Sequence, residues 1–217
     1  MPATMLELPN PFAPDHATLR LLEPTDADRS SLAARLRDGT YDKPFIVEDG
    51  RTRALHFCWT YVQSRMRLDD PVALQMTYTR MMMSFLLFHT TPRAVLILGL
   101  GGGSLAKYCH RNLPEARIVA VESNRDVLAL RDEFAVPSDD ARLTVVEADA
   151  GAWVAQTRAR IDQRAPSTYG GGGVGIARGQ PVVSFPRRRP GESAQAPPTT
   201  IGSARSNTQS IASPPIA

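Results

Sequence analysis

Hydrophobic and polar positions alternate along residues 44–68, which predicts β-strands. The stretch PFIVEDGRTRALHFCW contains two extended runs on either side of Asp49-Gly50, a dipeptide that supplies the positive φ of a tight hairpin. The stretch TYVQSRMRL alternates in the same way and fits a third strand with one face in water. We therefore predict a small antiparallel sheet. A proline-rich opening and a short helix near residues 30–37 precede it.

A long amphipathic helix is expected next. Asp69-Asp70-Pro71 is typical of a helix start, with acidic residues before a proline in the first turn. The apolar spacing carries the helix to about His89. The side chains at three- and four-residue spacing, which we expect to pack in the core, are Leu74, Tyr78, Met81, Met82, Phe85 and Leu86.

From Arg93 the pattern reads strand, glycine loop, helix, strand, helix, strand. Val95–Leu98 is uninterrupted apolar sequence, as expected for a parallel strand covered on both faces. Helices are expected over residues 105–113, 124–134 and 153–160, with strands in ARIVAVES and ARLTVVEADA. This order predicts an α/β fold, a Rossmann-like domain with an incomplete parallel sheet, preceded by the small antiparallel domain.

The composition changes abruptly at Gln163. The 55 residues from there on contain no Leu, Asp, Lys, Met, Trp, Cys or His, and Pro and Gly make up 16 of them. Such a segment cannot bury enough apolar surface to offset its ordering entropy, so we expect a disordered tail and no fourth strand. We interpret it as the product of a frameshift or truncation. The predicted division is 1–70, 71–162 and 163–217.

Charge and cysteine content exclude several classes of protein. The formal net charge is +3, but residues 1–162 carry 19 basic against 21 acidic groups, which gives −2 and argues against nucleic-acid binding. Two cysteines, Cys58 and Cys109, form neither a disulfide framework nor a zinc pattern, and Cys109 with its neighbour His110 is expected to pack on a helix. No metal, signal peptide or membrane span is expected, and the cytoplasm is the expected location.

The glycine loop is the strongest functional signal. Gly99, Gly101 and Gly103 follow a buried strand and precede a helix, where backbone can approach a ligand and helix N–H groups point at it. Glu122 ends the second strand, 19 residues beyond Gly103, where an acid binds a ribose diol. Asp149 ends the third strand, where a carboxylate can accept a hydrogen bond from adenine. Together they predict a nucleoside site.

The same spacing indicates which nucleoside is bound. Ser104 stands where a dinucleotide fingerprint has Gly or Ala, and an acid after the third strand is not part of that fingerprint. No Gly-Lys-Ser/Thr P-loop is present. S-adenosylmethionine or a relative therefore fits better than NAD.

The succession of YVQSRMRLDDP, YTRMM, LILGLGGGSLAK, VAVES and EADA resembles the spermidine synthase (polyamine aminopropyltransferase) family over about residues 40–162. That family transfers the aminopropyl group of decarboxylated S-adenosylmethionine to an amine. The resemblance implies a set of donor-binding residues, with Tyr78 near the substrate channel. These are Gln63 at the donor's tail, Gly99, Gly101 and Gly103 as its cradle, Glu122 at the ribose and Asp149 at the adenine.

The sequence departs from the family pattern at three places. The family loop commonly reads Gly-Gly-Gly-Asp-Gly-Gly, and Gly102 replaces the Asp that helps to hold the donor's amino end. The family's Tyr-His-Glu is Tyr78-Thr79-Arg80, which puts a base where a cationic amine should approach. The catalytic aspartate follows the family's fourth strand, and Asp162 matches only the start of that strand.

The catalytic residue of this chain is therefore unknown, and we expect little aminopropyl transfer, since a lost general base costs ~10²–10⁴ in rate. The amine acceptor also stays open. The alternatives are an S-adenosylmethionine-dependent methyltransferase, or a catalytically silent protein that binds nucleosides or forms a homodimer.

Overall fold

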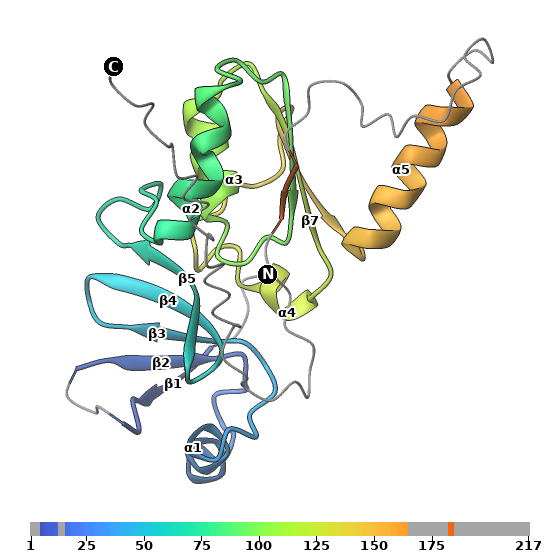
Figure 1. Ribbon diagram of the computed structural model, residues 1–217. Coiled ribbons are helices and arrows are strands. Elements are labelled where there is room, and N and C mark those ends of the chain that lie inside the picture. The colour runs from blue at the N-terminus through green and yellow to red at the C-terminus, as the bar shows by residue number, and fades with distance from the viewer. Residues whose placement is uncertain (1–4, 13–15, 165–181, 185–217) are drawn as a thin grey trace, which may run out of the picture. The chain divides into compact units, whose positions relative to one another are not determined.

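A computed structural model describes residues 5–12, 16–164 and 182–184, all within one compact unit, Met1–Arg187. Two sheets organise these residues (Figure 1). The rest of the predicted tail, with its expected disorder, lies outside the described residues. No helix in the described ranges is long and apolar enough to cross a membrane.

The N-terminal sheet is antiparallel and has five strands in sequence order. They are β1 (Leu6–Pro9), β2 (Thr18–Leu21), β3 (Phe45–Glu48), β4 (Thr52–Cys58) and β5 (Tyr61–Arg67). The predicted hairpin is confirmed: Gly50 has φ +79°, and Asp49 Oδ1 accepts the N–H groups of Arg51 and Thr52 at 2.9 and 2.6 Å. The predicted third strand is β5.

Strands β1 and β2 were not expected. Each has four residues, and the alternation is too short to stand out among the prolines of this region. Their leucines point inward and pack with helix α1 (Arg29–Arg37), which lies where a helix was predicted. Together they form the N-terminal core, whose leucines are Leu6, Leu8, Leu19, Leu21, Leu32 and Leu36.

The expected helix from Asp69 to about His89 is wrong at its start, whereas its end is close to the predicted one. Helix α2 (Thr77–Met82) begins eight residues late and continues as the 3₁₀ helix η1 (Met83–Leu87). Asp69 does not cap a helix, because its Oδ1 accepts from Arg67 Nε at 2.8 Å, and residues 71–73 form a turn. The apolar stripe is also incomplete, since Met81 is 68% exposed. Four residues of the stripe are partly buried and pack against the main hydrophobic core. They are Leu74, Met82, Phe85 and Leu86.

The second sheet is parallel and has the order β8-β7-β6-β9. The three strands that were predicted are β6 (Ala94–Leu98), β7 (Arg117–Glu122) and β8 (Leu143–Glu147). Strand β9 (Val182–Ser184) contradicts the expectation of no fourth strand, since it pairs with β6 through residues 96–98.

The helices of this half begin close to where the sequence placed them. Helix α3 (Ser104–Asn112) follows the glycine loop, and α5 (Ala150–Arg164) is longer than predicted. Helix α4 (Arg125–Ala129) is shorter than the predicted 124–134, because the chain turns after Leu130 and reaches φ +51° at Ala135.

One main core unites side chains from both sheets. Met66 of β5 and Ile46 of β3 belong to the same buried cluster as Ile97 and Ile118 of the parallel strands. Burial of this apolar surface is the main stabilising term for such a fold. The glycine loop starts at the end of β6 and is therefore anchored in this core.

Candidate functional site

The glycine loop leaves strand β6 in an unusual backbone conformation. Gly99, Gly101 and Gly103 have φ values of +91°, +54° and +65°, which L-residues rarely adopt. The Gly99 N–H donates to the Val121 carbonyl oxygen at 2.8 Å, so the loop is tied to β7 as it begins. Gly103 is the N-cap of α3 and offers no side-chain cap to the first turn. The sequence prediction of a strand, loop and helix is confirmed here.

The loop has one packed side and one open side. A Cβ atom on Gly103 would lie 2.2 Å from Val136 Cγ2, and one on Gly102 would lie 2.7 Å from Ser64 Oγ. A Cβ atom on Gly101 would have no atom within 4 Å. Gly102 and Gly103 are therefore needed for close packing. Gly101 is the position where a ligand can approach the backbone.

Glu122 holds the loop against the end of β7. Its Oε2 accepts the N–H of Leu100 at 2.9 Å, and its Oε1 accepts those of Ser123 and Asn124 at 2.9 Å each. The residue is only 9% exposed. A carboxylate has about four acceptor positions, so three backbone donors leave about one for a ligand hydroxyl. No pattern in the sequence indicated this structural role.

Asp149 lies at the same edge of the sheet as Glu122. The N–H of Ala148 donates to the Glu122 carbonyl at 3.0 Å, which brings the residues after β8 beside the end of β7. Asp149 is exposed, and its Oδ1 accepts the N–H of Ala152 at 2.9 Å, so it caps helix α5. Its position fits the sequence prediction, but capping also explains an acid here.

Gln63 of β5 and Tyr78 of α2 contact each other. The Tyr78 hydroxyl donates to the Gln63 carbonyl oxygen at 2.8 Å, and burial raises the pKa of Tyr78 to about 12. Next to Gln63 on β5, Ser64 lies against Gly102, and its Oγ is 3.1 Å from Ser104 Oγ. Strand β5 therefore supports the glycine loop directly.

Lys107 is a buried residue that no sequence motif indicated. It lies on α3, is 2% exposed, and its Nζ donates to the Phe134 carbonyl at 2.6 Å and to Met66 Sδ at 3.1 Å. Burial lowers its pKa to about 7. The available signal was its rarity, since the chain has only two lysines, Lys43 and Lys107.

The neighbouring Cys109 and His110 do not form a catalytic pair. Cys109 is fully buried, its Sγ is 4.0 Å from Met83 Sδ, and burial raises the pKa of its thiol to about 12. His110 Nε2 instead lies 2.8 Å from Asp140 Oδ2. The expectation of ordinary packing for this part of α3 is confirmed.

Two further features of the described residues bear on ligands. No group of three or more His, Cys, Asp or Glu within them is arranged to hold a metal ion. A cavity of about 340 Å³ is lined by the end of α4 and the residues that follow it, and by no residue of the glycine loop. Its lining residues are Leu128, Ala129, Arg131, Asp132, Val136, Ser138 and Asp139. None of these is a predicted donor-binding residue.

The parallel strands, the glycine loop and the acids at the ends of β7 and β8 define a Rossmann-like α/β domain preceded by an antiparallel sheet. The expected resemblance is also confirmed. The polyamine aminopropyltransferase of Chromobacterium violaceum is 42% identical over 118 residues, which are 54% of this chain and 45% of that protein. That of Neisseria meningitidis serogroup A is 38% identical over 119 residues, with the same coverage. The chain thus spans about half the length of these curated relatives.

A solved structure of a probable spermidine synthase from Corynebacterium glutamicum is 22% identical, with a TM-score of 0.43. The match covers 53% of this chain and 44% of the chain in that structure. No family model matches the chain.

Proposed function

We propose that this chain binds an adenosyl-sulfonium donor at the carboxyl ends of β6, β7 and β8, as part of an aminopropyltransferase-like protein. The likeness of about half of the chain to proteins named polyamine aminopropyltransferase supports this kind of function. The observation that carries the proposal is the contact between Glu122 and the Leu100 N–H, which joins the acid of β7 to the glycine loop. A nucleoside bound over Gly101 would have its ribose beside Glu122.

Each candidate residue then has a role in holding the donor. Gly99, Gly101 and Gly103 give the loop its shape, and Gly101 lets the ligand approach the backbone. The remaining acceptor position of Glu122 would accept a hydrogen bond from a ribose hydroxyl. Asp149 would accept one from the adenine amino group. Gln63 would meet the donor's tail.

The acceptor side of the reaction is proposed more generally. The relatives' name implies an amine acceptor, and Tyr78 would stand near its channel. The pKa of Tyr78, raised by burial to about 12, is far above neutral pH, so the hydroxyl holds its proton and donates to the Gln63 carbonyl oxygen. Tyr78 would therefore shape the wall between donor and acceptor rather than remove a proton.

Methyl transfer is the second candidate, and Gly102 favours it. The amino end of decarboxylated S-adenosylmethionine is a cation without a neighbouring carboxylate, which an acid in the loop would stabilise. Here Ser64 and the Phe134 ring, 2.7 and 3.0 Å from a Cβ on Gly102, fill the space of such a side chain. S-adenosylmethionine carries its own carboxylate and has less need of that acid.

Calorimetric titration of the purified chain with decarboxylated S-adenosylmethionine, S-adenosylmethionine and NAD tests the proposal. We expect one of the two sulfonium compounds to bind and NAD not to bind. Tighter binding of the decarboxylated compound supports aminopropyl transfer, and tighter binding of the other supports methyl transfer. Absence of binding by both, with the chain folded, would refute the proposed function.

A further inference from the structure

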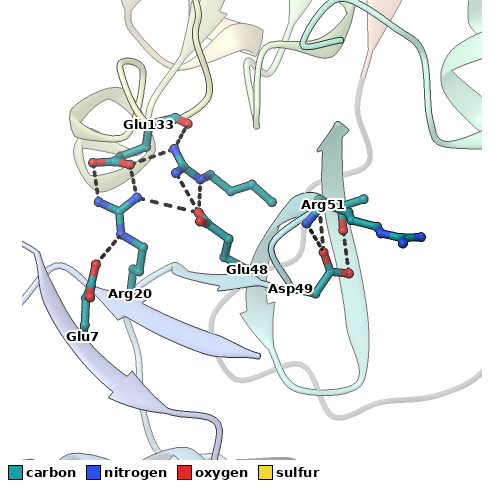
Figure 2. Close-up of polar contacts among 8 residues, drawn as sticks. Glu7, Arg20, Glu48, Asp49, Arg51 and Glu133 are labelled. Carbon is teal, nitrogen blue, oxygen red and sulfur yellow. Dashed lines mark hydrogen bonds and ion pairs between the residues drawn. The ribbon is translucent and has the colours of Figure 1, made fainter. Parts of the chain in front are cut away.

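Two arginines of the N-terminal sheet converge on one glutamate of the parallel domain. Arg20 of β2 contacts Glu133, which is 113 residues away in sequence (Figure 2). Arg53 of β4, 80 residues away in sequence, contacts the same carboxylate. Both carboxylate oxygens are used: Arg20 Nη2 is 3.1 Å from Oε1, and Arg20 Nη1 contacts Oε2. Arg53 Nη1 lies 2.9 Å from Oε2. Glu133 is therefore shared by two guanidinium groups.

The arginines are themselves held in place by the sheet. Arg53 Nε and Nη2 each lie 2.6 Å from Glu48 Oε2, and Arg20 Nε lies 3.4 Å from Glu7 Oε1. The side chains of Arg20, Arg53 and Glu133 are 16–19% exposed. Pairs at this depth are less screened by salt than surface pairs, and forked arginine contacts fix geometry as well as charge.

The contact with Arg53 reaches the backbone as well as the side chain. Arg53 Nη1 donates to the Glu133 carbonyl oxygen, and the next carbonyl, that of Phe134, accepts from Lys107 Nζ at 2.6 Å. Ala135 follows with φ +51°, a strained conformation for alanine. Segment 133–136 is therefore fixed from two sides, by the N-terminal sheet and by helix α3.

This same segment packs against the glycine loop. The Phe134 ring would be 3.0 Å from a Cβ on Gly102, and Val136 Cγ2 would be 2.2 Å from a Cβ on Gly103. Phe134 and Val136 are 1% and 5% exposed. Buried side chains of the segment therefore fill the space beside Gly102 and Gly103, which leaves the loop little freedom to shift without the segment.

We propose that Glu133 is a positioning residue, through which Arg20 and Arg53 of the N-terminal sheet fix segment 133–136 and so the shape of the glycine loop. Glu133 does not touch the ligand. Its effect passes through Phe134 and Val136 to Gly102 and Gly103. The consequence for ligand affinity rests on the proposed function, whereas the consequence for loop order does not.

The experiment compares the wild type with Glu133→Gln, which loses the charge and keeps the size. Hydrogen exchange is measured at backbone amides 99–107, several of which are hydrogen-bonded in the loop and the first turn of α3. Asp42→Asn is the matched charge control. Asp42 forms an exposed ion pair with Arg35, with 2.8 Å between Oδ1 and Nη2, and is not part of the contacts around the loop. Leu36→Val, in the N-terminal core, is the control for general loss of stability.

We expect Glu133→Gln to speed exchange at 99–107 more than Leu36→Val does when the two are compared at equal distance below their melting temperatures. Asp42→Asn should leave exchange there unchanged. The affinity for S-adenosylmethionine or its decarboxylated form, whichever binds the wild type, should fall roughly 2- to 30-fold in Glu133→Gln, the range for residues in a coupled network.

Equal exchange at 99–107 in Glu133→Gln and Leu36→Val would overturn the proposal. If the wild type binds neither sulfonium compound, the proposed function fails, and the exchange comparison still decides the role of Glu133. If Glu133→Gln does not fold, Arg53→Lys is measured in the same way, since lysine keeps the charge and loses the fork that joins Glu48 to the Glu133 carbonyl.

Discussion

Ser64 of strand β5 occupies the space into which a side chain at position 102 would extend. A Cβ atom on Gly102 would lie 2.7 Å from Ser64 Oγ and 3.0 Å from Ser64 Cβ. Gly102 has no positive φ, so space rather than backbone conformation requires glycine there. Position 102 corresponds to the aspartate of the Gly-Gly-Gly-Asp-Gly-Gly loop. In this chain Ser64 fills the space that such an aspartate side chain would need.

Replacing Gly102 by alanine should therefore destabilise the protein by about 1–3 kcal/mol, the usual cost of overpacking a core. Adding Ser64→Gly should recover part of this loss, because it removes the nearest atoms. Urea unfolding measures both effects. Gly101→Ala is the control: its cost comes from φ +54°, so Ser64→Gly should not reduce it. Equal recovery for both glycines would contradict the packing explanation.

Glu122→Gln should lower the free energy of unfolding by about 1–3 kcal/mol, because an amide nitrogen must then face at least one backbone N–H. The three donors now satisfied belong to Leu100, Ser123 and Asn124. The affinity for the adenosyl-sulfonium compound should fall as well, which calorimetry measures. Glu147→Gln is the matched control at the exposed end of β8, where Glu147 pairs with Arg125, and it should change little. Unchanged stability in Glu122→Gln would show that these contacts do not matter energetically.

Two substitutions of Asp149 separate its cap from its proposed contact with adenine. Asp149→Ala should cost about 0.5–2 kcal/mol of stability through loss of the N-cap of α5. Asp149→Asn keeps an oxygen for the Ala152 N–H and should leave stability nearly unchanged. It should nevertheless weaken donor binding, because its acceptor is uncharged. Full donor affinity in Asp149→Asn would leave capping as the role of this residue.

Stability should rise with pH between about 7 and 9 because of Lys107. In the unfolded chain its amine keeps its proton up to the ordinary pKa of 10.5, whereas burial lowers the folded pKa to about 7. The unfolded state therefore binds more protons in this range, and the slope is up to ~1.4 kcal/mol per pH unit. Above pH 9 the buried Cys109 thiol, with its pKa raised to about 12, opposes the trend.

The measurement is urea unfolding at several pH values, with Lys107→Met expected to remove most of the slope. Lys43→Met removes the same charge from a lysine that is 39% exposed, and it should leave the slope in place. If the two variants behave alike, the pH dependence does not come from the buried amine.

The purified chain, incubated with putrescine and decarboxylated S-adenosylmethionine, should release no methylthioadenosine above background. Arg80 is exposed and carries positive charge where the related pattern has an acid, and it would repel a cationic amine that approached along this face. The loop also lacks an acid for the donor's amino end. Turnover near ~1 s⁻¹, at the low end of ordinary enzymes, would contradict this expectation.

Much of the parallel domain could be predicted from the sequence because its signals are local. The apolar run before Gly99, the helix-forming residues after Ser104 and the acid at the end of β7 all act over a few neighbouring residues. The hairpin at Asp49-Gly50 is local in the same sense. The position of Glu122 at the end of β7 was therefore readable, and its three backbone partners were not.

The tertiary structure alone decided which side of the glycine loop is packed and which is open. Ser64 meets Gly102 and Val136 meets Gly103 across 38 and 33 residues of sequence, and no periodicity records such a pair. For the same reason the link from Arg20 to Glu133 was invisible, and Asp69 paired with Arg67 instead of starting a helix. Local patterns determine where strands, loops and helices form. Packing between distant segments determines which atoms meet, because burial and charge pairing depend on distance in space rather than along the chain.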